Sequence, residues 1–169
     1  FNHARRINIP LFSSPFDATA IDLLEELDTP AYKIASFELC DLQLIARAAQ
    51  TKKPLLMSTG LSSISEIEDA ISTAKDYGAG EILLFHCISS YPAEAKDSCL
   101  NNIRFLKDKF KVLVGLSDHT IDNTASIAST ILGVSAIEKH FIDCRERGGV
   151  DSTFSIDPNE LTRLKKVTY

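Results

Sequence analysis

Short apolar runs alternate with longer segments of helical periodicity along the whole chain. The apolar runs contain few polar residues, which is typical of strands that are buried on both faces of a parallel sheet. Six runs are predicted as strands, at 7–12, 31–35, 54–57, 81–85, 112–116 and 134–138. The segments between and after them are predicted as helices, at 17–27, 41–50, 63–77, 100–109, 121–132 and 158–166.

Capping residues support the predicted helix ends. Asp17 precedes the first helix, Ser63 and Glu66 match a capping box, and Pro158 follows an aspartate at a first helical position. Gly78 and Gly133 lie where two helices are expected to end. The local chemistry therefore agrees with the hydrophobic periodicity.

The repeated strand–helix order predicts a parallel α/β fold. Polar or small residues follow every predicted strand, which is typical of the C-terminal face of a (β/α)8 TIM barrel. A complete barrel has eight units and about 250 residues. The sequence therefore predicts one partial barrel domain over residues 1–169, with roughly the last six β-α units and without the first two.

Composition and charge narrow the classes of function. The 169 residues carry a net charge of −5 and show no basic stripe, which argues against nonspecific nucleic-acid binding. No apolar run approaches the ~20 residues that a membrane-spanning helix needs. Four cysteines without a CxxC pair predict reduced thiols in a cytoplasmic protein.

Two histidines stand out because each follows an apolar run. His119 and His140 are separated by a single predicted helix, so the strand–helix–strand unit would place both imidazoles at the same rim. Imidazoles with Asp118 and Glu138 beside them suit a divalent Mn, Zn or Fe ion with positions left open for substrate. The plainer alternative is two histidines that are hydrogen-bonded at strand ends.

Two lysines, Lys33 and Lys139, lie within apolar runs and need a counter-charge there. Each could reach the rim, or form an internal ion pair with Glu38 or Glu138. Each could also bind a phosphate or carboxylate, or act as a Schiff-base amine. Small hydroxyls at the strand ends would complete an anion cradle with Lys33; they are Ser36, Ser58, Thr59, Ser89 and Ser117.

Six motifs occur in series at these strand ends. They are Ser14-Pro15-Phe16-Asp17, Tyr32-Lys33-Ile34-Ala35-Ser36, Ser58-Thr59-Gly60, His86-Cys87 through Ser90-Tyr91-Pro92, Gly115-Leu116-Ser117-Asp118-His119 and Ile137-Glu138-Lys139-His140-Phe141. In this order and at these spacings they resemble the N-terminal barrel of the sialic acid synthases. Within the family, the segment that looks more like the pseudaminic acid synthase branch is Gly148-Gly149-Val150-Asp151-Ser152-Thr153-Phe154-Ser155. Many relatives that make N-acetylneuraminate carry Gly-Pro-Asp where this chain has Gly149-Val150-Asp151.

The resemblance implies a condensation of phosphoenolpyruvate with an N-acetylated amino sugar, which forms a nine-carbon 2-keto acid and releases phosphate. It implies that His119 and His140 hold a divalent cation, usually Mn2+ or Mg2+. The phosphate would be bound by Lys33, Ser36, Ser58, Ser89 and Ser117, and Lys139 is a further candidate for binding an anion. The sugar would contact Glu38, Tyr91 and Asp151 beside Phe16, with Glu38 and Asp151 as candidate catalytic carboxylates.

The resemblance also implies parts that lie outside this chain. In the family, two earlier strands supply a glutamate and a lysine, and a small C-terminal antifreeze-like domain reaches the partner's site in a homodimer. We therefore expect the full-length parent to be the active enzyme and the chain alone to be inactive. Two alternatives stay open: a Schiff-base aldolase that uses Lys33 or Lys139, and a non-catalytic anion-binding fragment.

Overall fold

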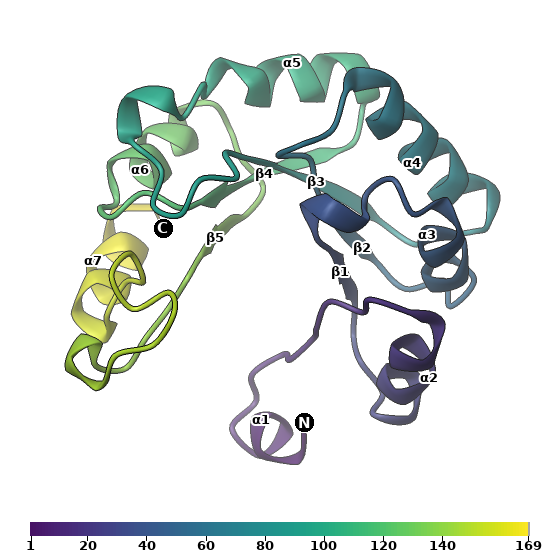
Figure 1. Cartoon of the computed structure of the whole chain (residues 1–169), viewed down its shortest axis with the longest axis horizontal. Coiled ribbons are helices and arrows are strands. Elements are labelled where there is room, and N and C mark those ends of the chain that lie inside the picture. The colour runs from purple at the N-terminus through teal and green to yellow at the C-terminus, as the bar shows by residue number, and fades with distance from the viewer. Residues whose placement is uncertain (169) are drawn as a thin grey trace. The chain divides into compact units, whose positions relative to one another are not determined.

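The computed structural model describes residues 1–168 and divides the chain into two compact units, Phe1–Leu84 and Phe85–Tyr169. Strands and helices alternate through both units (Figure 1). The strands follow one another in the sheet in chain order, β1-β2-β3-β4-β5. The observed fold is therefore α/β, as the sequence predicts.

The first unit contains two paired strands and the helices that follow them. β1 pairs in parallel with β2, and Tyr32 lies opposite Leu55. Both of these side chains are fully buried, because helices cover the strands on one side (Figure 1). The elements are α1 (Asn2–Arg6), α2 (Ala18–Glu26), β1 (Tyr32–Ile34), the 3-10 helix η1 (Ser36–Glu38), α3 (Leu42–Ala49), β2 (Leu55–Ser58) and α4 (Ile64–Asp76).

The predicted caps explain where the helices of the first unit begin. The carboxylate of Asp17 accepts a hydrogen bond from the Ala20 amide at 2.8 Å. At α4, the Ser63 hydroxyl accepts from the Glu66 amide, and the Glu66 carboxylate accepts from the Ser63 amide at 2.7 Å. The predicted capping box is therefore confirmed.

The second unit carries the strands that lead to the two histidines. β4 pairs in parallel with β5, with Ser117 opposite Glu138 and Asp118 opposite Lys139. After β3 (Ile82–Cys87), the elements are η2 (Ala95–Asp97), α5 (Asn101–Phe110), β4 (Leu113–Asp118), α6 (Thr124–Ile131), β5 (Ile137–Lys139), η3 (Arg145–Arg147) and α7 (Pro158–Thr168).

Gly115 allows a close approach in the middle of β4. A Cβ atom there would lie 2.7 Å from a ring carbon of Phe85 and 2.8 Å from the carbonyl oxygen of Ala136. A contact this short would force the Phe85 ring or the backbone of Ala136 to shift. Glycine therefore permits the tight packing of β4 two residues before Ser117.

The predicted strand at 7–12 is wrong. Residues 7–12 form no strand, and only Ser13 makes an isolated parallel bridge, to Tyr32. Ile7 and Ile9 are 51% and 56% exposed, so the apolar run is not buried on two faces. A strand requires pairing over several residues, which a hydrophobic run does not guarantee. The short helix α1 that precedes this run was not predicted either.

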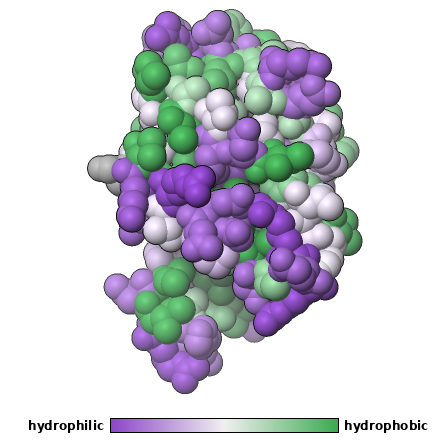
Figure 2. Space-filling model, turned by 90° about the vertical axis from the view of Figure 1, so that its left-hand side faces the viewer, coloured by the Kyte–Doolittle hydropathy of each residue, from purple (hydrophilic) through white to green (hydrophobic). Residues whose placement is uncertain are grey.

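The molecular surface mixes hydrophilic and hydrophobic residues. Figure 2 shows hydrophobic patches of limited extent between hydrophilic side chains on the face that it presents. Within residues 1–168, no helix has both the length and the apolar character that crossing a bilayer would require.

The capping box makes a stability prediction. Ser63→Ala removes the hydroxyl that caps α4, and we expect the free energy of unfolding to fall by about 1 kcal/mol. Urea denaturation measures this loss. Ser72→Ala, at an exposed position inside the same helix, is the matched control and should cost little. Equal losses in the two variants would contradict the capping role.

Candidate functional site

The ends of β4 and β5 bring Ser117, His119, Glu138 and His140 together on one face of the sheet. Side chains alternate along a strand, so residues two apart lie on the same face. The Ser117 hydroxyl donates to the Glu138 carboxylate at 2.6 Å. The ring centroids of His119 and His140 lie 5.3 Å apart in an edge-to-face arrangement. The two imidazoles thus share one small region of the second unit.

His119 is buried and its orientation is defined by the backbone. Its Nδ1 lies 2.8 Å from the carbonyl oxygen of Ile88, which can only accept a hydrogen bond. Nδ1 therefore carries the proton and Nε2 keeps a lone pair, 3.3 Å from the Ser117 hydroxyl. Burial is the largest cause and lowers the pKa of His119. The Ile88 carbonyl and the charges of Glu138 and Asp118 raise this pKa, and His140 lowers it, so the net shift is downward. The neutral imidazole is therefore favoured.

His140 is oriented by a carboxylate from the following loop. Its Nδ1 lies 3.1 Å from Oδ2 of Asp151, and both side chains are partly exposed. Such a contact leaves Nε2 of His140 available to another group. Asp151, predicted from the sequence as a site residue, therefore lies directly beside His140.

Two aromatic rings surround the imidazole pair. The Tyr91 ring lies 4.3 Å from the His119 ring, and the Phe154 ring lies 5.0 Å from the His140 ring, measured between centroids. Burial is the main cause that raises the pKa of Tyr91, with Cys87, Glu138 and Asp151 adding to it, so its hydroxyl stays protonated. Phe154 was not singled out from the sequence, where its only signal is an aromatic residue close to Asp151.

The donor atoms suit a divalent metal, but they do not form a complete shell. Imidazoles whose Nδ1 is engaged by an oxygen present Nε2 as a ligand, and histidine is a common ligand for Mn, Zn and Fe. Over residues 1–168, no group of three or more His, Cys, Asp and Glu side chains has the geometry of a metal site. The described residues thus fit as two ligands of a larger set.

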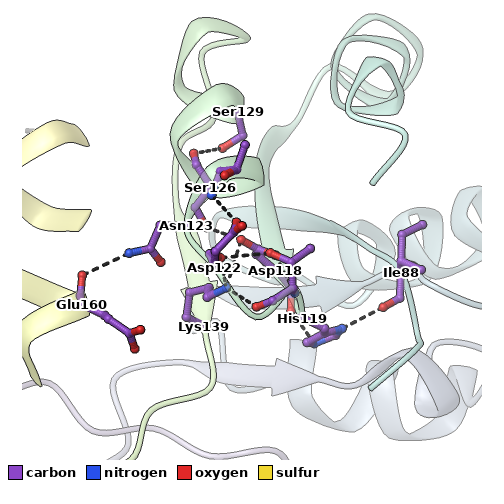
Figure 3. Close-up of polar contacts among 12 residues, drawn as sticks. Ile88, Asp118, His119, Asp122, Asn123, Ser126, Ser129, Lys139 and Glu160 are labelled. Atoms are coloured by element: carbon purple, nitrogen blue, oxygen red, sulfur yellow. Dashed lines mark hydrogen bonds and ion pairs between the residues drawn. The ribbon is translucent and has the colours of Figure 1, made fainter. Parts of the chain in front are cut away.

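Lys139 lies on the opposite face of the sheet from His119 (Figure 3). Its Nζ is 3.2 Å from Oδ2 of Asp118 and donates to the carbonyl oxygens of Thr120 at 2.7 Å and Asp122 at 2.9 Å. The side chains of Lys139 and Asp118 are 3% and 1% exposed. The expected internal ion pair does form, but with Asp118, because Glu138 points to the other face and meets Ser117.

The first unit holds the remaining predicted residues that follow β1 and β2. The Ser36 hydroxyl accepts a hydrogen bond from the Gly60 amide at 3.2 Å, and Ser58 is buried. Lys33 is half-buried on β1, whereas Phe16 is 66% exposed. This arrangement gathers small polar groups at the C-terminal ends of two neighbouring strands.

Two predicted site residues have a buried polar atom that lacks a hydrogen-bond partner in the described structure. They are Glu38, through Oε2, in the first unit, and Ser89, through its hydroxyl, in the second unit. Buried polar atoms in proteins are nearly always satisfied, so each of these atoms is a candidate for contact with a ligand or water.

Comparison with known proteins decides the family. A model described as the NeuB family matches residues 1–168. The chain belongs to the NeuB family. This NeuB-family chain is 45% identical over 159 residues to a pseudaminic acid synthase of Helicobacter pylori, covering 94% of the chain and 47% of that protein. It is 39% identical to an N,N'-diacetyllegionaminic acid synthase of Campylobacter jejuni, covering 96% of the chain and 49% of that protein.

Solved structures agree with the family. An N-acetylneuraminic acid synthetase from Leptospira borgpetersenii, solved with citrate, superposes with a TM-score of 0.95 at 34% identity, over 99% of this chain and 58% of that one. A DAHP synthase from Thermotoga maritima has a TM-score of 0.83 at 14% identity, over 98% of this chain and 51% of that one, and so shares the fold alone. The NeuB-family chain spans about half the length of the curated relatives it matches.

The environment of His119 makes a pH prediction. Its pKa is lowered by folding, so below the unfolded value of about 6.5 the unfolded chain binds more protons. The contribution of His119 to the free energy of unfolding is therefore fully present above pH 6.5. It is lost as the pH falls towards the pKa that His119 has in the folded chain. NMR titration should place the midpoint of His119 below 6.5, and a midpoint at or above this value would contradict its burial as a neutral imidazole.

Denaturant unfolding provides the matching stability measurement. We expect the free energy of unfolding to decrease between pH 7 and pH 5. His119→Gln should remove part of this decrease, whereas the rest should remain because burial also lowers the pKa of His86.

Proposed function

We propose that the full-length protein condenses phosphoenolpyruvate with an N-acetylated amino sugar to form a nine-carbon 2-keto acid of the sialic or pseudaminic type, with release of phosphate. The observation that carries this proposal is the pair of imidazoles, His119 and His140, at the ends of two parallel strands with each Nδ1 beside an oxygen acceptor. Membership of the NeuB family supports the same class of reaction.

In this proposal, His119 and His140 hold a divalent cation, Mn2+ or Mg2+, through their Nε2 atoms. Such an ion, when bound, acts as a Lewis acid on the sugar aldehyde. The protein's contribution is orientation: the Ile88 carbonyl holds one ring and the Asp151 carboxylate holds the other. Tyr91 and Phe154 pack against the imidazoles and limit their rotation.

The phosphate of phosphoenolpyruvate is the proposed ligand of the polar groups that follow β1 and β2. Lys33 would supply the positive charge, and the hydroxyls of Ser36 and Ser58 would donate hydrogen bonds, as phosphate oxygens require. Ser89 and Ser117 stay predicted phosphate ligands, and Ser117 would first have to release its hydrogen bond to Glu138. The buried Ser89 hydroxyl, which lacks a described partner, supports such a role.

The chemistry requires carboxylates as well as an anion site. The methylene carbon of phosphoenolpyruvate forms a bond to the sugar aldehyde carbon, and water adds to the carbon that bears the phosphate. The aldehyde oxygen takes up a proton and becomes a hydroxyl. Cleavage of the carbon–oxygen bond to phosphate, with loss of the proton of the hydroxyl that water supplied, then releases phosphate and leaves the keto group. A carboxylate that accepts the proton of the water serves the second step. We assign this class of role to Glu38 and Asp151, with the sugar also contacting Tyr91 and Phe16.

A Schiff-base aldolase that uses Lys139 is disfavoured. A nucleophilic amine must be reachable and unprotonated, whereas Lys139 Nζ is buried against the Asp118 carboxylate and two backbone carbonyls. We therefore leave Lys139 out of the substrate-binding set in this proposal.

Histidine substitutions test the proposed metal dependence. His119→Ala and His140→Ala should each weaken Mn2+ binding to the chain by at least about tenfold, measured by electron paramagnetic resonance of free Mn2+. In the full-length protein, each variant should abolish phosphate release from phosphoenolpyruvate and amino sugar. His3→Ala, on the exposed helix α1, is the control and should bind Mn2+ normally.

Two results would overturn this proposal. The first is a pair of histidine variants that keep full activity. The second is a wild-type full-length protein that does not bind Mn2+. If the chain binds Mn2+ and phosphoenolpyruvate but the full-length protein shows no turnover, the result would instead support the non-catalytic alternative.

Borohydride trapping separates the proposed reaction from the Schiff-base chemistry. Incubation of the full-length protein with a keto acid and borohydride should leave its mass unchanged, and EDTA should inhibit phosphate release. A covalent adduct on Lys33 or Lys139, located by peptide mass mapping, would favour the aldolase.

A further inference from the structure

A buried ion pair lies directly behind the two imidazoles of the second unit. Asp118 precedes His119 and Lys139 precedes His140, and the two charged residues are direct cross-strand partners. Their side chains lie on the sheet face opposite the imidazoles, as Figure 3 shows for Lys139 and His119. Each member of the ion pair is thus adjacent in sequence to one member of the imidazole pair.

Asp118 has its carboxylate fully occupied by hydrogen bonds. Oδ1 accepts from the amide and the hydroxyl of Thr120 at 2.9 and 2.7 Å. Oδ2 accepts from the Ser126 hydroxyl of α6 at 2.5 Å and lies 3.2 Å from Lys139 Nζ. The Asp118 carboxylate therefore binds Thr120, on the other side of His119, and the Ser126 hydroxyl anchors it to α6.

Lys139 ties the end of β5 to the turn after β4. Its Nζ donates to the carbonyl oxygens of Thr120 and Asp122. On the other side of His140, the amide of Ile156 donates to the carbonyl oxygen of His140 at 2.9 Å. Two sets of hydrogen bonds thus fix the backbone around His140: those of the Lys139 side chain, one residue before it, and the bond from Ile156 to the carbonyl of His140 itself.

We propose that Asp118 and Lys139 are positioning residues that set the separation and orientation of His119 and His140. They contact neither imidazole, and they act through the strand ends that they join. A buried pair with every polar atom matched holds one geometry, whereas an apolar pair of similar size would lack directional bonds. The inference deepens the proposed function, because the imidazole geometry it controls is that of the proposed metal ligands.

The test uses a double variant of the chain. Lys139→Met alone would leave the Asp118 charge buried without a partner, and the chain could then fail to fold. Asp118→Asn combined with Lys139→Met removes both charges and keeps one oxygen that can accept from Thr120, while the amide nitrogen can donate to the Ser126 hydroxyl. Lys107→Met is the control, because Lys107 also donates to backbone carbonyls, those of Leu132 and Gly133, at a site remote from the histidines.

Two readouts decide the inference. In the metal-free chain, the imidazole nitrogen signals of His119 and His140 should shift in the double variant, whereas the signal of buried His86 should stay unchanged. With Mn2+ added, the dissociation constant should rise by about tenfold or more in the double variant. Lys107→Met should change neither readout. Because the charge of Asp118 also acts on His119 through space, the readout that reports geometry is the nuclear Overhauser contact between the His119 and His140 rings, whose centroids lie 5.3 Å apart. None of these readouts depends on turnover.

A folded double variant with wild-type imidazole signals and wild-type Mn2+ affinity would overturn the inference. If the double variant does not fold, Ser126→Ala, which removes one neutral hydroxyl bond to Asp118, carries the test with the same readouts and the same criteria. If the wild-type full-length protein does not bind Mn2+, the proposed function fails, and the metal-free signals still decide whether Asp118 and Lys139 position the histidines.

Discussion

The parallel pairing of β4 with β5 is the constraint on which the candidate site depends. Its register places Ser117 opposite Glu138 and Asp118 opposite Lys139. Because side chains alternate between faces, a shift of β5 by one residue relative to β4 would place the two imidazoles on opposite faces and would separate Asp118 from Lys139 in the same way. The β4–β5 register thus determines which polar side chains meet on each face of the sheet.

Several features of the second unit maintain this register. Gly115 permits the close approach of β4 to its neighbours, and Asp118 and Lys139 join the strand ends on the helix side. On the other face, Ser117 bonds to Glu138, and the aromatic rings of Tyr91 and Phe154 contact the imidazoles. The site is therefore supported from both faces of the sheet, which is what a preorganised ligand geometry requires.

The sequence predicted best what depends on neighbouring residues. The capping box at Ser63 and Glu66 is a local pattern, and the structure contains it. The strand proposed at 7–12 failed because strand formation depends on pairing partners distant in sequence. The partner of Lys139 was missed for a similar reason, since only the register shows that Asp118 and not Glu138 shares its face. Phe154 was missed because its contact with His140 arises from the fold of the intervening loop.

The central claim is that His119 and His140 act together as ligands of one ion. Pulsed electron paramagnetic resonance of Mn2+ bound to the chain measures this directly, because imidazole nitrogens bound to Mn2+ produce resolvable nitrogen couplings. The account predicts couplings from two imidazoles in the wild-type chain, and from one at most in His119→Ala or His140→Ala. Bound Mn2+ without any nitrogen coupling would contradict it.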